Sequence, residues 1–207
     1  MPRRGATDSR EVLIGATIDL VRQKGYSATR IDDICTVSGL TKGGLFHYFS
    51  SKDELGIAAA NVWRENANAL LASADYHQHR SAAKRLLGYV DFRKSLIEGE
   101  IHEWSCYAGT TLQESYSSHP DVAGAAARAI SENIDALVAD ATAALAEAGR
   151  DPAQAREIAA FTQTVIQGAF VVAKAEGGAE MAVSMLDHLR RYFELLFNLS
   201  PSEASTA

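Results

Sequence analysis

Residues 29–55 read TRIDDICTVSGLTKGGLFHYFSSKDEL, and this stretch decides the fold of the first part of the chain. Apolar residues at helical spacing predict two short helices on either side of Ser38-Gly39-Leu40, where Gly39 permits a sharp turn. Thr41 is expected to cap the second of these helices, and Leu45 and Phe49 are expected to bury its inner side. Two short helices joined by so tight a turn are typical of a helix-turn-helix.

The helices around this pair are predicted from the residues at their ends. A helix of about residues 9–24 is expected to stop at Gly25, which suits the left-handed conformation that often ends a helix. Thr29-x-x-Asp32 resembles a capping box at the start of the first short helix, and Ser51-x-x-Glu54 is a full capping box that opens a longer helix. Residues 1–55 are therefore predicted to form a separate three-helix domain.

The second short helix has the composition of a surface that lies against DNA. Gly43 and Gly44 lack side chains, so the backbone can approach DNA closely. Thr41 and Lys42 place a hydroxyl and an ammonium at the end of a recognition helix that reaches base edges in the major groove. An arm at the N-terminus, with basic residues in positions 3 and 4, is expected either to touch DNA or to be disordered.

Polar side chains continue beyond this helix start. His47 and Tyr48 end in polar groups that suit backbone phosphates. Lys52 stands in the first turn of the next helix, where the helix dipole favours acids rather than bases. A nearby phosphate would explain a lysine in that position, so the pattern indicates a second phosphate contact.

Charge is distributed unevenly along the chain. The net charge of −6 argues by itself against nucleic-acid binding, but residues 1–52 hold eight Lys and Arg against five Asp and Glu, a balance of +3. The other 155 residues (207 minus 52) hold 12 basic and 21 acidic side chains, a balance of −9. A small basic module on an acidic body fits a DNA-binding domain joined to a larger domain.

Residues 9–55 resemble, nearly throughout and without a gap, the DNA-binding domain of the TetR family of transcriptional regulators. The resemblance rests on the motifs Gly25-Tyr26-x-x-Thr29, Gly39-Leu40-Thr41-x-Gly43-x-Leu45-Phe46-x-Tyr48-Phe49 and Ser51-Lys52-x-x-Leu55. It implies an all-helical homodimeric repressor whose C-terminal domain binds a small ligand. Phe46 stands where the family often has tyrosine. The candidate DNA-binding residues are Thr29, Thr41, Lys42, Gly43, Gly44, His47, Tyr48 and Lys52.

The rest of the chain is predicted as helices separated by proline and glycine. The fold class is all-α with about nine helices: a helix-turn-helix domain at 1–55, a larger ligand-binding and dimerisation domain at 56–200, and a disordered tail at 201–207. The last two helices, about residues 152–176 and 180–198, are apolar on more than one face, as expected when one face meets a partner. The resemblance implies that two copies meet there in a four-helix bundle.

The ligand site is predicted from composition. Residues 102–114, HEWSCYAGTTLQE, gather aromatic, hydroxyl, amide and thiol groups on a short helix, which suits an apolar pocket with a few orienting polar groups. For any one residue, plain core packing is the alternative. The candidate ligand-binding residues are Trp63, His102, Trp104, Cys106, Tyr107, Thr110, Gln113, Phe161, Gln167, Phe170 and Lys174.

The two cysteines, Cys35 and Cys106, are too few for a disulfide framework. No apolar run of signal-peptide or membrane-spanning length is present, so we expect a cytoplasmic protein with reduced thiols and no membrane contact. Cys106 at a helix start, with Lys174 near the end of a later helix, resembles a subgroup of these repressors that sense electrophiles or oxidants. A buried packing thiol is the alternative, and for Cys35 the simple expectation.

No other chemistry is indicated by the sequence. The spacing of His102, Glu103, Cys106 and His119 matches no strong zinc pattern, and no nucleophile elbow or phosphate loop is present. We therefore expect no enzyme, no cofactor and no metal. The favoured function is a repressor released from a palindromic operator by a small molecule. The alternative is a helical ligand-binding or cysteine-based sensor protein without specific DNA binding.

Overall fold

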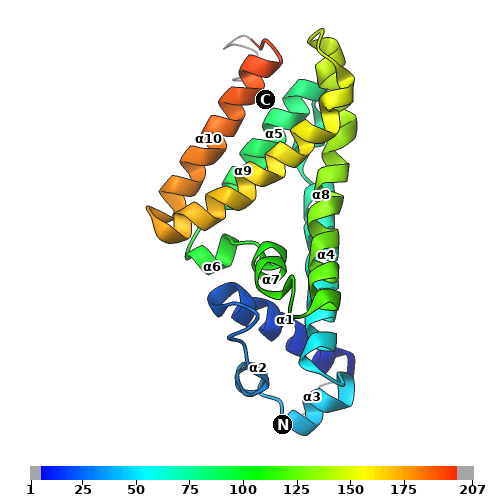
Figure 1. Cartoon of the computed structure of the whole chain (residues 1–207), viewed down its shortest axis with the longest axis vertical. Coiled ribbons are helices and arrows are strands. Elements are labelled where there is room, and N and C mark those ends of the chain that lie inside the picture. Colours follow the sequence, from blue (N-terminus) through cyan, green and yellow to red (C-terminus); the bar gives the residue numbers. More distant parts are fainter. Residues whose placement is uncertain (1–5, 200–207) are drawn as a thin grey trace. The chain divides into compact units, whose positions relative to one another are not determined.

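The computed structural model describes residues 6–199, and among these the side chains from Ser9 onward. All regular structure in this part of the chain is helical, as predicted, with ten α-helices and two short 3-10 helices against the nine or so expected (Figure 1). The predicted basic arm and the predicted tail at 201–207 lie outside the described residues. The helices are α1 (Ala6–Lys24), α2 (Ile31–Ser38), α3 (Lys42–Tyr48), α4 (Lys52–Ala72), η1 (Asp75–Gln78), α5 (Ala82–Ser95), α6 (Ile101–Trp104), α7 (Tyr107–Ser115), α8 (Pro120–Glu147), η2 (Pro152–Gln154), α9 (Ala155–Ala175) and α10 (Gly178–Leu196).

The chain forms two compact units that do not coincide with the predicted domains. The first unit joins the chain up to Ala67 with Ser105–Ile130, and the second joins Asn68–Trp104 with the chain from Ser131 onward. α4 and α8 each contribute residues to both units. Because packing and function divide a chain by different criteria, the DNA-binding and ligand-binding domains at 1–55 and 56–200 stay a prediction.

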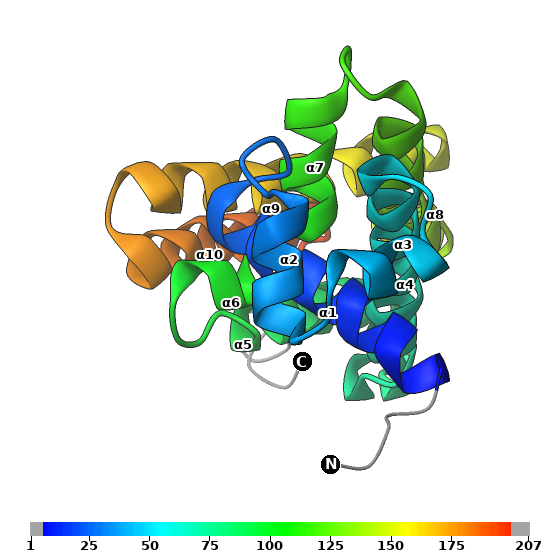
Figure 2. The same ribbon diagram turned by 90° about the horizontal axis from the view of Figure 1, so that it is seen from below.

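The first unit contains the predicted helix-turn-helix, α2 and α3. α1 lies against α2, α3 and α7 (Figure 2). Ile34 from α2 and Leu45 from α3 are fully buried in one apolar core with residues of α1, α4 and α7. The turn between α2 and α3 is closed by the Leu40 N–H, which donates to the Cys35 carbonyl over 3.2 Å. Gly39 has a φ of 71°, the left-handed conformation that glycine adopts without strain.

Two of the three predicted helix caps are present, one of them in altered form. The Thr41 hydroxyl accepts the Gly44 N–H over 3.1 Å at the start of α3, as predicted. The Ser51 hydroxyl accepts the Glu54 N–H over 3.1 Å at the start of α4. The Glu54 carboxylate, however, accepts the N–H of Ser50, one residue earlier than a standard capping box requires.

The predicted capping residue of α2 is wrong by one position, because Arg30 and not Thr29 precedes the helix. α2 begins at Ile31, and the Arg30 N–H donates to the Asp33 carboxylate over 2.9 Å. The Thr29 hydroxyl instead donates to the Gly25 carbonyl over 2.7 Å, inside the core. Thr29 is therefore committed to the turn that follows α1, and the carboxylate next to the helix start is that of Asp33 rather than Asp32.

The second unit is built on α5, α9 and α10. α10 packs against both other helices, and ion pairs join it to α5, with Lys94 2.9 Å from Asp187 and Arg190 3.0 Å from Asp91. Part of the apolar surface of α9 and α10 is buried in the core of the chain: Ala169, Phe170, Leu186, Leu189 and Phe193. Other apolar side chains of the same two helices are exposed: Phe161, Val171, Val172, Tyr192 and Leu195.

One helical segment among the described residues, Pro152–Ala175, is long and apolar enough to cross a membrane by length and composition alone. Nearly half of it is buried inside the fold. Core helices of soluble proteins pass the same test, so this segment is weak evidence for a membrane.

Candidate nucleic-acid interface and ligand site

α3 buries one side and exposes the other. Leu45 is fully buried in the core of the first unit. Thr41, Lys42, Gly43 and His47 are exposed, and their surface carries an ammonium, an imidazole and bare backbone. The predicted recognition helix therefore presents the predicted residue types to solvent.

Lys42 is held by an exposed ion pair. Its Nζ lies 2.7 Å from Asp32 Oδ1, and the two side chains are 59% and 68% exposed. The hydrogen bond to Asp32 raises the pKa of Lys42, so the ammonium stays charged. Exposed pairs contribute little to stability, about 0–1 kcal/mol, because water competes for both partners. A phosphate can therefore replace Asp32 at small cost.

Lys52 is held in a different way. Its Nζ donates to the Tyr26 carbonyl over 2.6 Å and lies 4.2 Å from the centre of the Tyr26 ring. Burial lowers the pKa of Lys52, while the charges of Asp53 and Glu114 oppose that change. This contact explains why a lysine stands in the first turn of α4, so no phosphate is needed to account for it.

Asp53 contacts both Tyr26 and His119. Its carboxylate accepts the Tyr26 hydroxyl over 2.7 Å and lies 2.9 Å from Nδ1 of His119. Partial burial favours the neutral acid, but the hydrogen bonds from Tyr26 and His119 outweigh it and lower the pKa of Asp53. Desolvation and the bond to Asp53 together raise the pKa of Tyr26.

Glu114 completes this cluster from α7. Its carboxylate accepts the Ser27 N–H over 2.9 Å, in the turn between α1 and α2. We name Tyr26, Lys52, Asp53, Glu114 and His119 the Tyr26 joint. This cluster could not be predicted, because His119 follows Asp53 by 66 residues and no local pattern links them.

The remaining DNA-binding candidates differ in exposure. Thr29 is only 1% exposed, so its side chain is not positioned to contact DNA and serves the turn instead. Tyr48 is half-buried, and its ring meets that of His47 edge to face at 5.0 Å. Gly44 is also half-buried, and its N–H donates to the Thr41 hydroxyl. Phe46, which no polar pattern singled out, is 50% exposed.

The ligand candidates of the first unit are mostly packing residues. The Trp63 ring carries the Arg22 guanidinium at 5.0 Å and lies 6.1 Å from the Tyr107 ring. Tyr107 is fully buried, its hydroxyl donates to the Gly56 carbonyl over 3.1 Å, and burial raises its pKa. Gln113 is exposed and Thr110 half-buried.

Cys106 has a defined structural position at the start of α7. Its Sγ accepts the Gly109 N–H over 3.3 Å, and the side chain is half-buried against an alanine-rich cluster. Cys35 packs against the core of the first unit, and burial raises the pKa of its thiol. Among the described residues no group of three or more His, Cys, Asp or Glu is arranged to hold a metal ion.

The ligand candidates of the second unit include one buried pair. Trp104 and Phe170 pack with ring centres 5.5 Å apart, and the buried Trp104 indole N–H has no hydrogen-bond partner within the part of the chain that the structure describes. Gln163 also has a buried side-chain oxygen without a partner among the described residues, while its Nε2 donates to the Tyr89 hydroxyl over 2.8 Å. Phe161 is exposed beside Tyr192. His102 and Gln167 are half-buried, and Lys174 is exposed.

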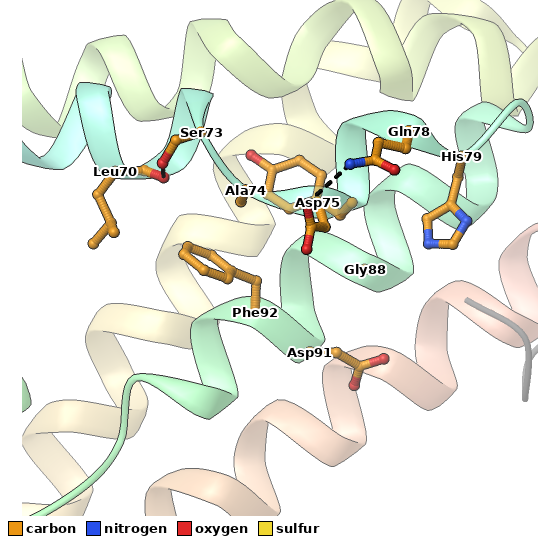
Figure 3. A pocket seen from close by; sticks show the side chains of 10 residues that line it. Leu70, Ser73, Ala74, Asp75, Gln78, His79, Gly88, Asp91 and Phe92 are labelled. Carbon is orange, nitrogen blue, oxygen red and sulfur yellow. Dashed lines mark hydrogen bonds between the residues drawn. The ribbon is translucent and has the colours of Figure 1, made fainter.

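A separate hollow of about 690 Å³ lies on the second unit where the end of α4, η1 and α5 meet (Figure 3). Phe92 and Gly88 line it from α5, and Gln78 donates to Asp75 at its rim over 2.9 Å (Figure 3). None of the predicted ligand residues lines this hollow, because composition singled out α6, α7 and α9 instead.

Comparison with known proteins identifies the N-terminal part. Residues 13–59 match the model of bacterial regulatory proteins of the tetR family. The transcriptional regulator AcuR of Cereibacter sphaeroides is 36% identical over 63 residues, which cover 29% of each chain. The HTH-type transcriptional regulator RutR of Escherichia coli K12 is 29% identical over 84 residues, covering 35% of this chain and 40% of RutR. These curated relatives are therefore matched over less than half of their length.

The likeness of the fold extends further. A TetR family transcriptional regulator from Agrobacterium tumefaciens superposes with a TM-score of 0.79 at 19% identity, covering 91% of this chain and 98% of that one. At that identity the superposition speaks for the fold alone. The matched N-terminal segment includes the whole helix-turn-helix, α2 and α3. Residues 13–59 therefore belong to the tetR family of bacterial regulatory proteins, and the fold of the chain is that of TetR family regulators.

Proposed function

We propose that this chain is a transcriptional repressor that binds a palindromic DNA operator as a homodimer and releases it when a small molecule binds. The exposed face of α3 carries the proposal, since Lys42 stands there with only an exposed aspartate as its partner. Family membership supports it, and the matched relatives AcuR and RutR are named as transcriptional regulators. Such a protein acts in the cytoplasm and needs no enzymatic activity.

Dimerisation is proposed through α9 and α10. Phe161 is 41%, Val172 42% and Leu195 76% exposed, and all three belong to these helices. A two-fold contact uses the same patch on both copies, so these side chains can bury one another. Two recognition helices would then reach half-sites about one DNA turn, roughly 34–36 Å, apart or at a larger spacing.

Effector binding is proposed for the second unit. The buried Trp104 N–H and the buried Gln163 side-chain oxygen both lack a partner. An unsatisfied buried polar group costs about 1–3 kcal/mol, and a ligand that supplies the missing acceptor or donor recovers that cost. A ligand with a flat apolar body suits the aromatic surfaces of Trp104 and Phe170.

The test is selection of duplexes from a randomised pool with the full-length protein, followed by titration of the enriched duplex at several salt concentrations. Lys42→Ala is expected to weaken binding at least about tenfold and to reduce the salt slope by about one for each half-site, as loss of one phosphate contact per protomer does. Arg156→Ala is the matched control, because Arg156 forms an equally exposed ion pair with Asp135 in the second unit. Equal loss in both variants, or no enriched sequence, contradicts the proposal.

A second function is favoured by the position of Cys106. A half-buried thiol that caps α7 can signal its own modification by losing the hydrogen bond from Gly109. The protein would then be a cysteine-based sensor that does not need specific DNA binding. Treatment with iodoacetamide separates the two functions. The sensor alone is supported if the treatment changes the far-UV circular dichroism or the tryptophan fluorescence, if Cys106→Ser abolishes that change, and if no duplex is enriched.

A further inference from the structure

Phe46 is an apolar side chain on a surface built for polar contacts. It is 50% exposed in α3, whereas Phe49, three residues later, is 2% exposed and belongs to the core. Phe46 is absent from the side chains that pack on the core of the first unit. A phenyl ring offers neither a hydrogen-bond donor nor an acceptor, so it cannot bind a phosphate as a tyrosine can.

The surface beside Phe46 is open. Gly43 lies three residues earlier, which places it on the same side of the helix. A Cβ added at Gly43 would meet no atom closer than the Thr41 hydroxyl at 3.9 Å. His47 and Lys42 are exposed nearby in the sequence of the helix and supply polar groups. The phenyl ring is thus a single apolar feature, beside bare backbone, on the face proposed to enter the major groove.

The major groove contains one apolar feature that an exposed phenyl ring can recognise. Thymine carries a C5-methyl group there, and the other three bases present hydrogen-bonding groups or bare ring carbon. We propose that Phe46 reads thymine by packing on this methyl group, and that it sets a base preference at one position of each half-site. This inference rests on the proposed DNA-binding function and adds the chemistry by which α3 selects a base.

The experiment uses the duplex enriched by the full-length protein from a pool made with thymidine. That duplex is remade with deoxyuridine in place of thymidine, one symmetric pair of positions at a time, which removes only the methyl groups. At one such pair, wild-type affinity is expected to fall about fourfold for each half-site, because burying a single methyl group contributes about that factor. Loss of the methyl groups from both half-sites should lower the affinity roughly fifteenfold. Other pairs are expected to change affinity less than twofold.

Two variants make the result specific. Phe46→Ala should bind the thymidine duplex more weakly and lose the difference between thymidine and deoxyuridine, while Phe46→Leu should keep part of it. Val37→Ala is the control, because Val37 is a 58% exposed apolar residue on α2. It should leave the difference unchanged. Exposed Phe46 carries little of the fold, and an unchanged thermal midpoint of the variants checks this.

The failures are distinguishable. If no duplex is enriched, the proposed DNA-binding function fails and this inference falls with it. If a duplex is enriched but every deoxyuridine replacement leaves wild-type affinity within twofold, DNA binding stands and the role of Phe46 is overturned. The same holds if Phe46→Ala retains the full discrimination, because the methyl group is then read by another side chain.

Discussion

Lys42 and Lys52 lie ten residues apart and belong to two regions that hold a cation in opposite ways. On the exposed face of α3, Lys42 meets one carboxylate in water. In the Tyr26 joint, Lys52 is half-buried and donates to a backbone carbonyl under an aromatic ring. A sequence pattern gives both the same DNA-binding role. The surroundings show that one lysine is available to a new partner and the other already fastens two segments of its own chain.

The largest effect on stability is expected at Gly56, which lies against the Tyr26 ring of the joint. A Cβ at Gly56 would lie 2.8 Å from the fully buried Tyr26 ring, closer than packed atoms allow. Gly56→Ala is therefore expected to lower the free energy of unfolding by about 1–3 kcal/mol, as overpacking does. Gly124→Ala in α8 is the control, because nothing lies within 4 Å of its added Cβ. It should raise stability by about 0.5–1 kcal/mol. Urea denaturation measures both, and equal effects would refute the tight contact.

The two lysines themselves give the next largest difference. Lys52→Met is expected to cost about 1–2 kcal/mol of stability, because the Tyr26 carbonyl loses a charged donor and the ring loses its cation. Lys42→Met should leave the stability nearly unchanged, because water competes for both partners of its exposed ion pair. DNA affinity should rank the two differently, with Lys42→Met reducing it directly. Comparable stability losses in the two variants would show that the environments are equivalent after all.

The smallest effect depends on pH. The pKa of Asp53 is lower in the folded protein than its ordinary value of 3.8, so the unfolded chain binds a proton more readily. The stabilisation from Asp53 is then complete above about pH 4 and is lost as the pH falls through the folded pKa. The difference in unfolding free energy between wild type and Asp53→Asn should shrink on acidification. Tyr26→Phe should reduce the pH-dependent part, and a gap that stays constant with pH would contradict this origin.

Local features of the DNA-binding part could be predicted from the sequence. The Thr41 cap, the Gly39 turn and the burial of Leu45 each follow from a short local pattern, and the structure has all three. The start of α2 was missed because two adjacent aspartates offered the same local signal. The turn after α1 decides between them, because the Thr29 hydroxyl donates to the Gly25 carbonyl there and does not cap α2.

Long-range features could not be predicted in the same way. Asp53, Glu114 and His119 come from distant parts of the chain, and nothing in their local sequence records which helix each will face. The ligand candidates stay a prediction, and their grouping in space could not be predicted for a related reason. Aromatic and polar residues near 102–114 do lie close in sequence, but the chain divides between Trp104 and Ser105, and each side packs into a different compact unit.

One contact of the Tyr26 joint has a consequence for observation. The Ser27 N–H sits in an exposed turn, where amide hydrogens normally exchange with solvent almost at once, yet it is bonded to the Glu114 carboxylate of α7. The amide at position 27 is therefore expected to exchange more slowly than its exposure suggests, because the bond to Glu114 must break first. Hydrogen–deuterium exchange at this one amide thus reports how stable this contact of the joint is.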